Sequence, residues 1–448
     1  MLRRFCCVVA GLYVGLHHSA AQTNFITLAP DGAWTWFNDP RALLHHGTLF
    51  FGYVRDSDGR IVLSAFDPAA RTRTDLWTST LTQKDDHDNP GLLVMSDGRM
   101  LAIYSRHGTD HFFSYRTATA TNPISALDWT EEKRVTTGAG VTYSNPFQLS
   151  AEGGRIYDFM RDLNFNPTVI FSTNYAQSWS QPRILIKTGT GKTRPYVKYC
   201  SNYSNRIDFL YTDGHPRDVT NSLYHAYYKS GMIHKTDDSP LKQLSDLPLL
   251  HDSGERGSVI YLYSEAATAD FNNHVPFGRA WCWEIAYQSN GFPVCVFSVG
   301  LHGRDVDWSE DRIFYYYARW TGTNWQKRMI ANAGRPLYQS ERDYAGGICL
   351  DPEDPNVVYL SSNAAEPFNF SDIQHGRLAE HERYEIWRGV TADGGKSFAC
   401  QPVTTNSPPD NLRPYVPRNH GSQPALIWFR GKYSSYTSHE CAVVGILQ

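Results

Sequence analysis

The feature that most constrains this chain is a hairpin plan that recurs seven times along it. Each copy has a short apolar strand, a turn rich in Gly, Asn, Asp or Ser, and a second apolar strand, as in "PGLLVMSDGRMLAIYS" around Asp97. This pattern is typical of a β-hairpin. The turns fall near His46, Asp97, Glu152, Ser204, Asn290, Glu353 and His420, at regular intervals apart from one wider gap between the fourth and the fifth.

Regular recurrence of hairpins indicates an all-β fold built from repeats. Each interval leaves room for one further strand pair, and seven four-stranded units around an axis make a seven-bladed β-propeller. A two-sheet sandwich would need fewer strands. We therefore expect residues 22–448 to form a single propeller domain, although 448 residues are many for one ordinary domain.

Two short segments match a turn motif that recurs in propellers. "TADGGKSF" (391–398) fits the pattern S/T-x-D-x-G-x-x-F/W, and "STNYAQSW" (172–179) is a weaker version with Asn for Asp and Ala for Gly. In such a turn the Asp or Asn caps the backbone and the aromatic residue packs inward. Both segments are predicted to close the outer hairpin of a blade and to carry no chemistry.

Charge and the N-terminus limit where the protein acts and what it binds. The net charge is −3 and no basic run occurs, so neither nucleic acid nor an anionic membrane surface is an expected partner. Residues 1–21 have two arginines, an apolar run and then small residues, the pattern of an export signal. That run is too short to span a bilayer. We expect a secreted or periplasmic protein that is a monomer.

The cysteines suggest no covalent framework. Six follow the predicted signal, namely Cys200, Cys282, Cys295, Cys349, Cys400 and Cys441, and no CxxC pair occurs among them. An oxidising destination would permit disulfides. Because free cysteine is among the most buried residue types, we expect mostly buried thiols with at most one bridge.

His87 and His107 are placed symmetrically about the turn of one predicted hairpin. His87 lies ten residues before Asp97, and His107 lies ten residues after it. Residues equidistant from a hairpin turn lie side by side across the two strands. Both imidazoles are therefore expected at the open end of one hairpin, on a rim of the propeller, where loops carry function.

The next two hairpins repeat this placement. Tyr143 and Arg161 lie nine residues on either side of position 152, and Tyr196 and His215 flank position 205. Three consecutive blades thus direct His, Tyr and Arg side chains to one face, and His87, His107, Tyr143 and Arg161 are the predicted catalytic set. The residues predicted to contact a substrate around that set are Asn89, Asn145, Arg194, Tyr196, Lys198, Tyr199, His215 and Arg217.

Each of these residues also has a structural explanation when it is taken singly. A histidine on a rim is commonly a solvated loop residue, Tyr143 could simply pack, and Arg161 could pair with Asp158 or Asp162. The coincidence of two histidines, a tyrosine and an arginine on one face is what favours function.

This combination of side chains suits β-elimination from a uronic-acid polysaccharide. A cation neutralises the sugar carboxylate and acidifies the proton on C5, a base removes that proton, and an acid protonates the departing O4. Arginine binds carboxylates bidentately and keeps its charge, whereas histidine and tyrosine can move protons. For glucuronate the C5 proton and O4 leave from the same side, so base and acid can be one residue or close neighbours.

At these residues the sequence resembles BNR-repeat polysaccharide lyases with a seven-bladed propeller. The segments that carry the likeness are "WTWFNDPRA", "DDHDNPGL", "YSRHG", "TYSNP", "RPYVKY", "TDGHPR", "DYAGGICLDPEDPNVVY", "YEIWRGVTADGGKSF" and "NLRPYVP". The likeness runs from about residue 29 to the C-terminus. The group includes ulvan lyases and the rhamnose–glucuronate lyases that act on arabinogalactan side chains.

The resemblance implies elimination at an L-rhamnose-α-1,4-D-glucuronate linkage of an acidic polysaccharide. The family's two histidines match His87 and His107. Its Tyr and Arg best match Tyr143 and Arg161, although the interval between them is longer here. The absence of an appended module favours the rhamnose–glucuronate lyases, with gum arabic as a substrate, over ulvan lyases.

The resemblance also bears on metals and on hydrolysis. Some ulvan lyases hold a structural zinc with His and Cys, but this chain has "LYH" at 223–225 in place of a Cys-x-His. No metal or cofactor is therefore expected, with His215, His225 and Cys282 kept as an alternative ligand set. A related propeller group hydrolyses the same linkage with one His elsewhere, so His45 and His46, which we interpret as turn residues, stay in view.

Two other function classes remain open. A sialidase-like or rhamnosidase-like hydrolase would need paired carboxylates. Candidates are Asp85, Asp86, Asp88, Asp110, Asp162 and Asp213. A non-catalytic sugar-binding propeller would also place Trp, Tyr and Arg on a rim. The lyase is preferred because the residues best placed by hairpin symmetry are imidazoles and a phenol.

Overall fold

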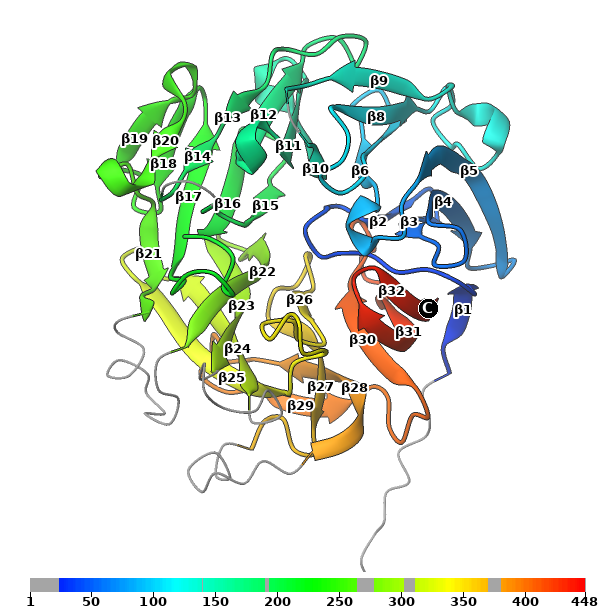
Figure 1. Ribbon diagram of the computed structural model, residues 1–448, viewed down its shortest axis with the longest axis vertical. Coiled ribbons are helices and arrows are strands. Elements are labelled where there is room, and N and C mark those ends of the chain that lie inside the picture. The colour runs from blue at the N-terminus through cyan, green and yellow to red at the C-terminus, as the bar shows by residue number, and fades with distance from the viewer. Residues whose placement is uncertain are drawn as a thin grey trace, which may run out of the picture.

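The computed structural model describes residues 24–447 except 139, 190–192, 264–277, 302–310 and 370–379. Within these residues, seven antiparallel sheets surround a central axis as the blades of a propeller (Figure 1). The prediction of an all-β, seven-bladed propeller is confirmed. The expected export segment, residues 1–21, lies outside the described residues.

The blades follow one another in chain order. Blade 1 contains β2 (Ala42–His45), β3 (Thr48–Val54), β4 (Arg60–Asp67) and β5 (Thr72–Thr82). Blade 2 contains β6 (Gly91–Val94), β7 (Met100–Tyr104), β8 (Phe112–Thr117) and β9 (Lys133–Thr136). Blade 3 contains β10 (Thr142–Leu149), β11 (Arg155–Arg161), β12 (Pro167–Ser172) and β13 (Arg183–Ile184). Blade 4 contains β15 (Val197–Ser201), β16 (Arg206–Thr212), β17 (Leu223–Lys229), β18 (Met232–Lys235), β19 (Pro240–Gln243) and β21 (Ser258–Tyr261).

The last three blades complete the ring. Blade 5 contains β22 (Arg279–Tyr287), β23 (Pro293–Leu301), β24 (Arg312–Trp320) and β25 (Trp325–Gly334). Blade 6 contains β26 (Ile348–Leu350), β27 (Val357–Ala364), β28 (Glu380–Val390) and β29 (Ala399–Pro402). Blade 7 contains β30 (Asp410–Tyr415), β31 (Ala425–Ser435), β32 (Ser438–Leu447) and β1 (Ile26–Ala29).

A few short elements complete the described chain, within the blades and between them. Strands β14 (Ile186–Lys187) and β20 (Leu249–Leu250) form a small parallel pair. The 3-10 turns are η1 (Asp86–Asp88), η2 (Ala126–Asp128), η3 (Ser150–Glu152), η4 (Leu163–Phe165), η5 (Leu244–Asp246) and η6 (His251–Ser253).

Each predicted hairpin forms the two innermost strands of a blade, from β2–β3 in blade 1 to β30–β31 in blade 7. These strands are buried on both faces because neighbouring blades pack against them. All eight residues of β10, for example, are buried. The wider gap after the fourth hairpin is explained by blade 4, whose sheet has six strands.

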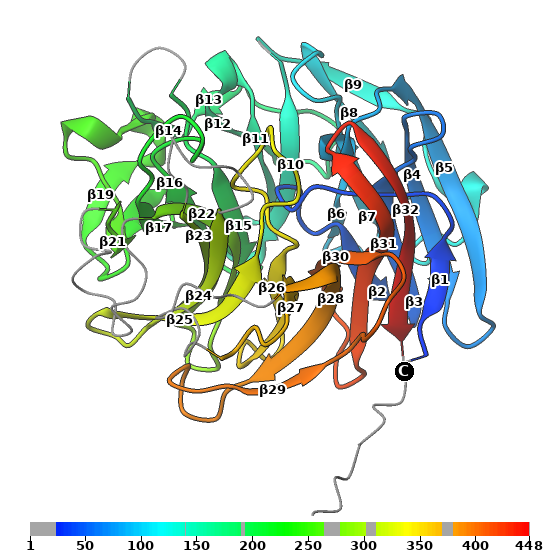
Figure 2. The same ribbon diagram turned by 60° about the horizontal axis from the view of Figure 1, so that its bottom comes forward.

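Blade 7 joins the two ends of the described chain. Its innermost three strands come from the C-terminal region, and its outermost strand is β1, which pairs antiparallel with β32. Figure 2 shows β1 beside β32 and β31 at one side of the ring. The ring is therefore closed by hydrogen bonds between segments that are far apart in sequence.

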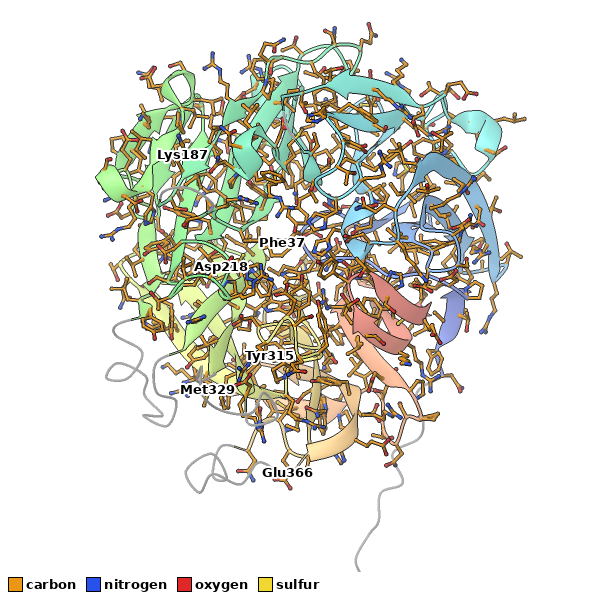
Figure 3. All side chains as sticks on the ribbon, viewed as in Figure 1. Phe37, Lys187, Asp218, Tyr315, Met329 and Glu366 are labelled. Atoms are coloured by element: carbon orange, nitrogen blue, oxygen red, sulfur yellow. The ribbon has the colours of Figure 1, made fainter. Side chains whose placement is uncertain are left out.

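The segment between β1 and β2 fills the middle of the ring, and we call residues 34–41 the central segment. Its Trp36 indole stacks on Trp283 of blade 5 with ring centroids 4.2 Å apart, and its Nε1 donates to the Cys282 carbonyl at 3.0 Å. Its Asp39 forms a buried ion pair with Lys198 of blade 4. Phe37 of this segment is labelled near the centre of the ring in Figure 3.

The two predicted turn motifs have the expected structure. Asp393 Oδ1 accepts from the backbone N–H groups of Lys396 and Ser397 at 2.9 Å each. Asn174 Oδ1 accepts from the Ser178 N–H at 2.9 Å in the weaker copy. These contacts close turns, as predicted.

The cysteines agree with the sequence expectation. All six cysteines beyond the predicted signal are free thiols, and only Cys400 is not fully buried. In the described part of the chain, no helix has the length and apolar character required to cross a bilayer.

Ring closure predicts that β1 matters more to stability than its short length indicates. Leu28 is 1% exposed and belongs to the main core, whereas its neighbour Thr27 is exposed. Replacing Leu28 by Ala should lower the free energy of unfolding by about 2–5 kcal/mol through lost burial and the cavity left behind. Thr27→Ala is the matched control and should change it little. Equal effects in chemical denaturation would contradict this role of β1.

Candidate active site

His87 and His107 come together at the open end of the β6–β7 hairpin. The register pairs Gly91 with Ile103, and its continuation beyond the strands places position 87 opposite position 107. The two imidazole rings stack with centroids 4.3 Å apart and an interplanar angle of 23°. The placement predicted from hairpin symmetry is thus observed.

One carboxylate holds both rings. Asp85 caps the 3-10 turn η1, where its Oδ1 accepts from the His87 N–H at 3.0 Å and from His87 Nδ1 at 2.6 Å. Its Oδ2 lies 2.8 Å from His107 Nδ1. Because each Nδ1 is engaged by Asp85, the proton of a neutral ring resides on Nδ1 and its Nε2 is left as an acceptor.

The two histidines differ in charge at neutral pH. Burial opposes the charged form of His87, but the carboxylates of Asp85 and Asp86 outweigh it and raise its pKa to about 9. Burial and the neighbouring His87 cation lower the pKa of His107 to about 4, even though Asp85 acts in the opposite direction. His87 is therefore a cation, and His107 is a neutral base whose Nε2 has no hydrogen bond to any described residue.

Tyr143 lies beside this pair in a strained conformation. It sits at a bulge of β10, between Thr142 and Asn145, with a φ of 67°. A non-glycine residue in this region costs about 1–3 kcal/mol, and such strain concentrates at functional sites. Its ring centroid is 5.6 Å from that of His87 and 6.2 Å from that of His107.

The Tyr143 hydroxyl is uncommitted and keeps its proton. No described protein group hydrogen-bonds to it, and burial raises its pKa well above 10. A phenol of this kind can donate a hydrogen bond or a proton at neutral pH.

Arg161, at the end of β11, supplies an uncompensated cation. Its guanidinium carbon lies 4.6 Å from the centroid of the Tyr143 ring, and its Nη1 donates to the Tyr196 hydroxyl at 3.2 Å. It forms no ion pair with a described carboxylate, so the alternative that it pairs with Asp158 is not observed. A buried guanidinium without a counter-ion is suited to receive an anionic ligand.

A cleft lies on the blade 4 side of Tyr196, the residue that accepts a hydrogen bond from Arg161. It has a volume of about 370 Å³ and is lined by residues that include Arg194, Tyr196, His215 and Arg217. His215 packs on Tyr196 with centroids 5.3 Å apart, although the β15–β16 register does not place the two opposite each other. Burial is the main cause that lowers the pKa of His215 to about 3, and the nearby Arg217 cation lowers it further.

Four of the residues predicted to contact a substrate lie instead in the interior. Asn89 and Asn145 are 1% exposed and hydrogen-bond to the central segment. Lys198 is 1% exposed and binds Asp39 and the Trp36 carbonyl. Tyr199 stacks on Phe159 in a separate core cluster. None of the four lines the cleft beside Arg194. Asn145 and Tyr199 do line a small cavity, together with Tyr143, Arg161 and Tyr196.

Three residues near the histidines were not identified from the sequence. The Tyr344 hydroxyl lies 3.4 Å from His87 Nε2, and the Tyr436 ring centroid lies 5.1 Å from that of His87. Glu341 accepts a hydrogen bond from Arg217 and lies 3.6 Å from His215 Nε2. They come from loops of blades 6 and 7, which no local pattern links to the β6–β7 hairpin.

The potential metal ligands near the site already have protein partners. Within the described residues, one group of potential ligands converges, namely Asp85, His87 and His107. Its Nδ1 atoms already bind the carboxylate directly. The alternative set is not assembled, because His225 binds Asp208 and Thr236 whereas Cys282 contacts the Tyr196 carbonyl.

The remaining candidates lie elsewhere or are engaged. His45 and His46 are at the β2–β3 turn, and His45 Nε2 bonds to the Thr121 carbonyl at 2.7 Å. Asp110 forms an ion pair with Arg106.

Comparison with known proteins gives a family match and structural neighbours. A family model described as "BNR repeat-containing family member" matches residues 34–333. A PL25 ulvan lyase bound to -[GlcA(1-4)Rha3S]- has a TM-score of 0.65 at 10% identity, with 94% of this chain and 95% of that chain covered. A second PL25 ulvan lyase structure gives 0.65 at 11% identity over the same shares.

A third structure, the polysaccharide lyase Uly1, has a TM-score of 0.53 at 10% identity, with 95% of this chain and 99% of that chain covered. At such identities the likeness concerns the fold. No curated protein sequence matches this chain.

The shared carboxylate predicts a distinctive pH dependence. His87, with a pKa raised to about 9, stabilises the fold fully below the ordinary value of about 6.5, and this contribution is lost as pH rises through 9. His107, with a pKa lowered to about 4, resists protonation, so stability is lost as pH falls from about 6.5 through 4. NMR titration of the two rings should give these midpoints. In Asp85→Asn the pKa of His87 should fall well below 9, and an unchanged value would contradict the assignment.

Proposed function

This chain belongs to the BNR repeat-containing family, and we propose that it is a polysaccharide lyase that cleaves uronate linkages by β-elimination. The observation that carries the proposal is the arrangement around Asp85. One carboxylate holds a neutral and a cationic imidazole side by side, next to a protonated phenol and an unpaired guanidinium. Elimination from a uronate needs a base, an acid and a cation, and these groups supply them.

In the proposed reaction Arg161 binds the uronate carboxylate and stabilises the charge that develops when C5 loses its proton. Neutral His107 takes that proton on Nε2, the C5–H electrons form the C4–C5 double bond, and the C4–O4 bond breaks. Tyr143, whose pKa lies well above 10, gives its proton to O4. The proton on His107 then returns to the Tyr143 oxygen through solvent, which resets the site.

His87 has a different part in this scheme. It is a buried cation beside the base, so it stabilises negative charge on the substrate electrostatically. Base and acid lie on neighbouring elements, which fits syn elimination from glucuronate, where the C5 proton and O4 leave from the same side.

We propose an L-rhamnose-α-1,4-D-glucuronate linkage as the target, in arabinogalactan side chains such as those of gum arabic, with ulvan as a further candidate. The PL25 structure bound to -[GlcA(1-4)Rha3S]- supports this class of substrate by analogy of fold. The N-terminal sequence supports export, and the polysaccharide would be met outside the cell. We propose that the enzyme acts as a monomer without a cofactor.

The first test is the nature of the product. Incubation with gum arabic or ulvan should raise ultraviolet absorbance, because elimination leaves an unsaturated uronate. Release of sugar without that chromophore would replace the lyase by the hydrolase. Binding without any release would favour a sugar-binding propeller.

The second test is the loss of each proposed group. His107→Ala and Arg161→Ala should each lower kcat/KM at least about 10²-fold, because they remove the base and the carboxylate partner. His46→Ala, an exposed histidine at a distant turn, is the matched control and should leave activity unchanged. If the two active-site variants unfold in thermal melts while the control does not, these residues are structural.

Tyr143→Phe tests the acid separately. It keeps the packing of the ring and removes the hydroxyl, so we expect kcat to fall by about 10²-fold or more with little change in melting temperature. A substrate with a good leaving group at C4 needs less acid assistance and should recover much of the loss. An equal loss on both substrates would assign protonation of O4 to another residue.

A further inference from the structure

Two strand residues of the described chain share an unusual backbone conformation. Tyr143 in β10 and Arg413 in β30 are the only non-glycine residues inside a described strand with positive φ, at 67° and 53°. Each sits at a bulge of an innermost strand, in blades 3 and 7. Strain of this kind is maintained at functional sites. Because Tyr143 lies in the proposed active site, the same strain at Arg413 points to a functional role for that residue as well.

The side chain of Arg413 is buried without a hydrogen-bond partner. It is 2% exposed, and its Nε, Nη1 and Nη2 atoms form no hydrogen bond with any described group. Its guanidinium carbon lies over the Trp36 ring at 4.2 Å, and the centroids of Trp283, Tyr344 and Tyr433 are 5.4, 5.4 and 5.5 Å away. We call these four rings the aromatic cage. Its contacts are cation–π, so the guanidinium has little direct polar compensation.

The aromatic cage connects Arg413 to the histidine pair. The Tyr433 hydroxyl donates to Asp86 Oδ2 at 2.7 Å, and the Tyr344 hydroxyl lies 3.4 Å from His87 Nε2. Asp86 Oδ1 in turn lies 3.1 Å from His87 Nδ1. The Arg413 backbone N–H donates to the Gly346 carbonyl at 2.6 Å, which fixes the loop that carries Tyr344. Arg413 is therefore linked to His87 in two ways, through Tyr344 directly and through Tyr433 and Asp86.

Arg413 contributes to the charge balance around Asp85, Asp86 and His87. Asp85 and Asp86 bring two negative charges into the buried region, and His87 supplies one positive charge. Although burial opposes ionisation of Asp86, the cations of His87 and Arg413 lower its pKa below the ordinary value. The other titratable or charged groups that face Asp86 are Asp85, Tyr338, Tyr344 and Tyr433. Those tyrosines are neutral at working pH, so Arg413 is the cation that balances the second carboxylate.

We propose that Arg413 is a positioning residue of the active site, which keeps Asp86 ionised and thereby holds His87 as a fixed cation beside the reacting sugar. This inference rests on the proposed lyase function. A purely structural account is less suitable, because an apolar side chain of similar length would fill the aromatic cage without burying a charge. Replacing a whole buried ion pair by apolar residues is commonly neutral or stabilising, whereas removing one partner alone leaves an uncompensated buried charge.

The test compares Arg413→Met with Arg413→Lys. Methionine should fill the aromatic cage but leave Asp86 without its balancing cation, so we expect a lower melting temperature. It should also lower kcat by about tenfold or more with KM within about twofold, by analogy with residues that orient reacting groups through a partner. Lysine keeps the charge and should recover part of kcat.

In the methionine variant Asp86 protonates at higher pH, so the acidic limb of the kcat–pH profile should move upward. Arg430→Met, which removes a guanidinium 5.1 Å from the centroid of the Phe25 ring in the same blade, should change neither kcat nor the profile.

A measurement that does not need turnover separates this inference from the lyase proposal. The carboxyl ¹³C signal of Asp86, assigned by its loss in Asp86→Asn, should titrate at higher pH in Arg413→Met than in the wild type and in Arg413→Lys. Absence of lyase activity in the wild type would overturn the proposed function and, with it, the catalytic meaning of Arg413. An unchanged Asp86 titration and kcat, with a lower melting temperature in Arg413→Met, would make Arg413 a structural anchor only.

Discussion

The central segment is the constraint on which the rest of the structure depends. Seven blades around an axis leave a middle that each blade alone cannot fill, and residues 34–41 fill it with aromatic rings. Trp36 stacks on blade 5 and Asp39 pairs with Lys198 of blade 4. The same segment supports the proposed site, since the Asn38 amide donates to the His87 and Asn89 carbonyls. The residues that pack at the axis thus also position His87.

Two identical side chains on the one Asp85 carboxylate become different reagents because their other surroundings differ. Both imidazoles bind this carboxylate through Nδ1. His87 also lies beside the carboxylate of Asp86, whereas His107 is buried beside the His87 cation. Their pKa values are therefore driven apart, one to about 9 and the other to about 4. Such a separation lets one site hold a neutral base, His107, beside a cation, His87, at the same pH.

Hairpin periodicity explains which parts of the site could be predicted from the sequence. Residues that face each other across a tight hairpin are fixed by local register, so His87 and His107 followed from counting alone. Lys198 also faces inward, but the central segment covers it, and the adjacent Tyr199 turns into the core between blades because side chains alternate along a strand. Tyr344 and Arg413 reach the site from blades 6 and 7. Their proximity depends on ring closure, which no local pattern encodes.

The distribution of strain indicates how the fold tolerates such a site. The bulges at Tyr143 and Arg413 each turn one side chain out of the regular strand alternation, at an energetic cost. Among the other five inner hairpins of the described chain, only β22–β23 has a register shift, between Cys282 and Glu284. The apolar residues of these hairpins are mostly buried, so packing between blades can support a few irregular positions and a buried charge cluster at the centre. The two bulges with a positive φ occur in blades 3 and 7, where they place a phenol and a guanidinium in the surroundings of the same histidine pair.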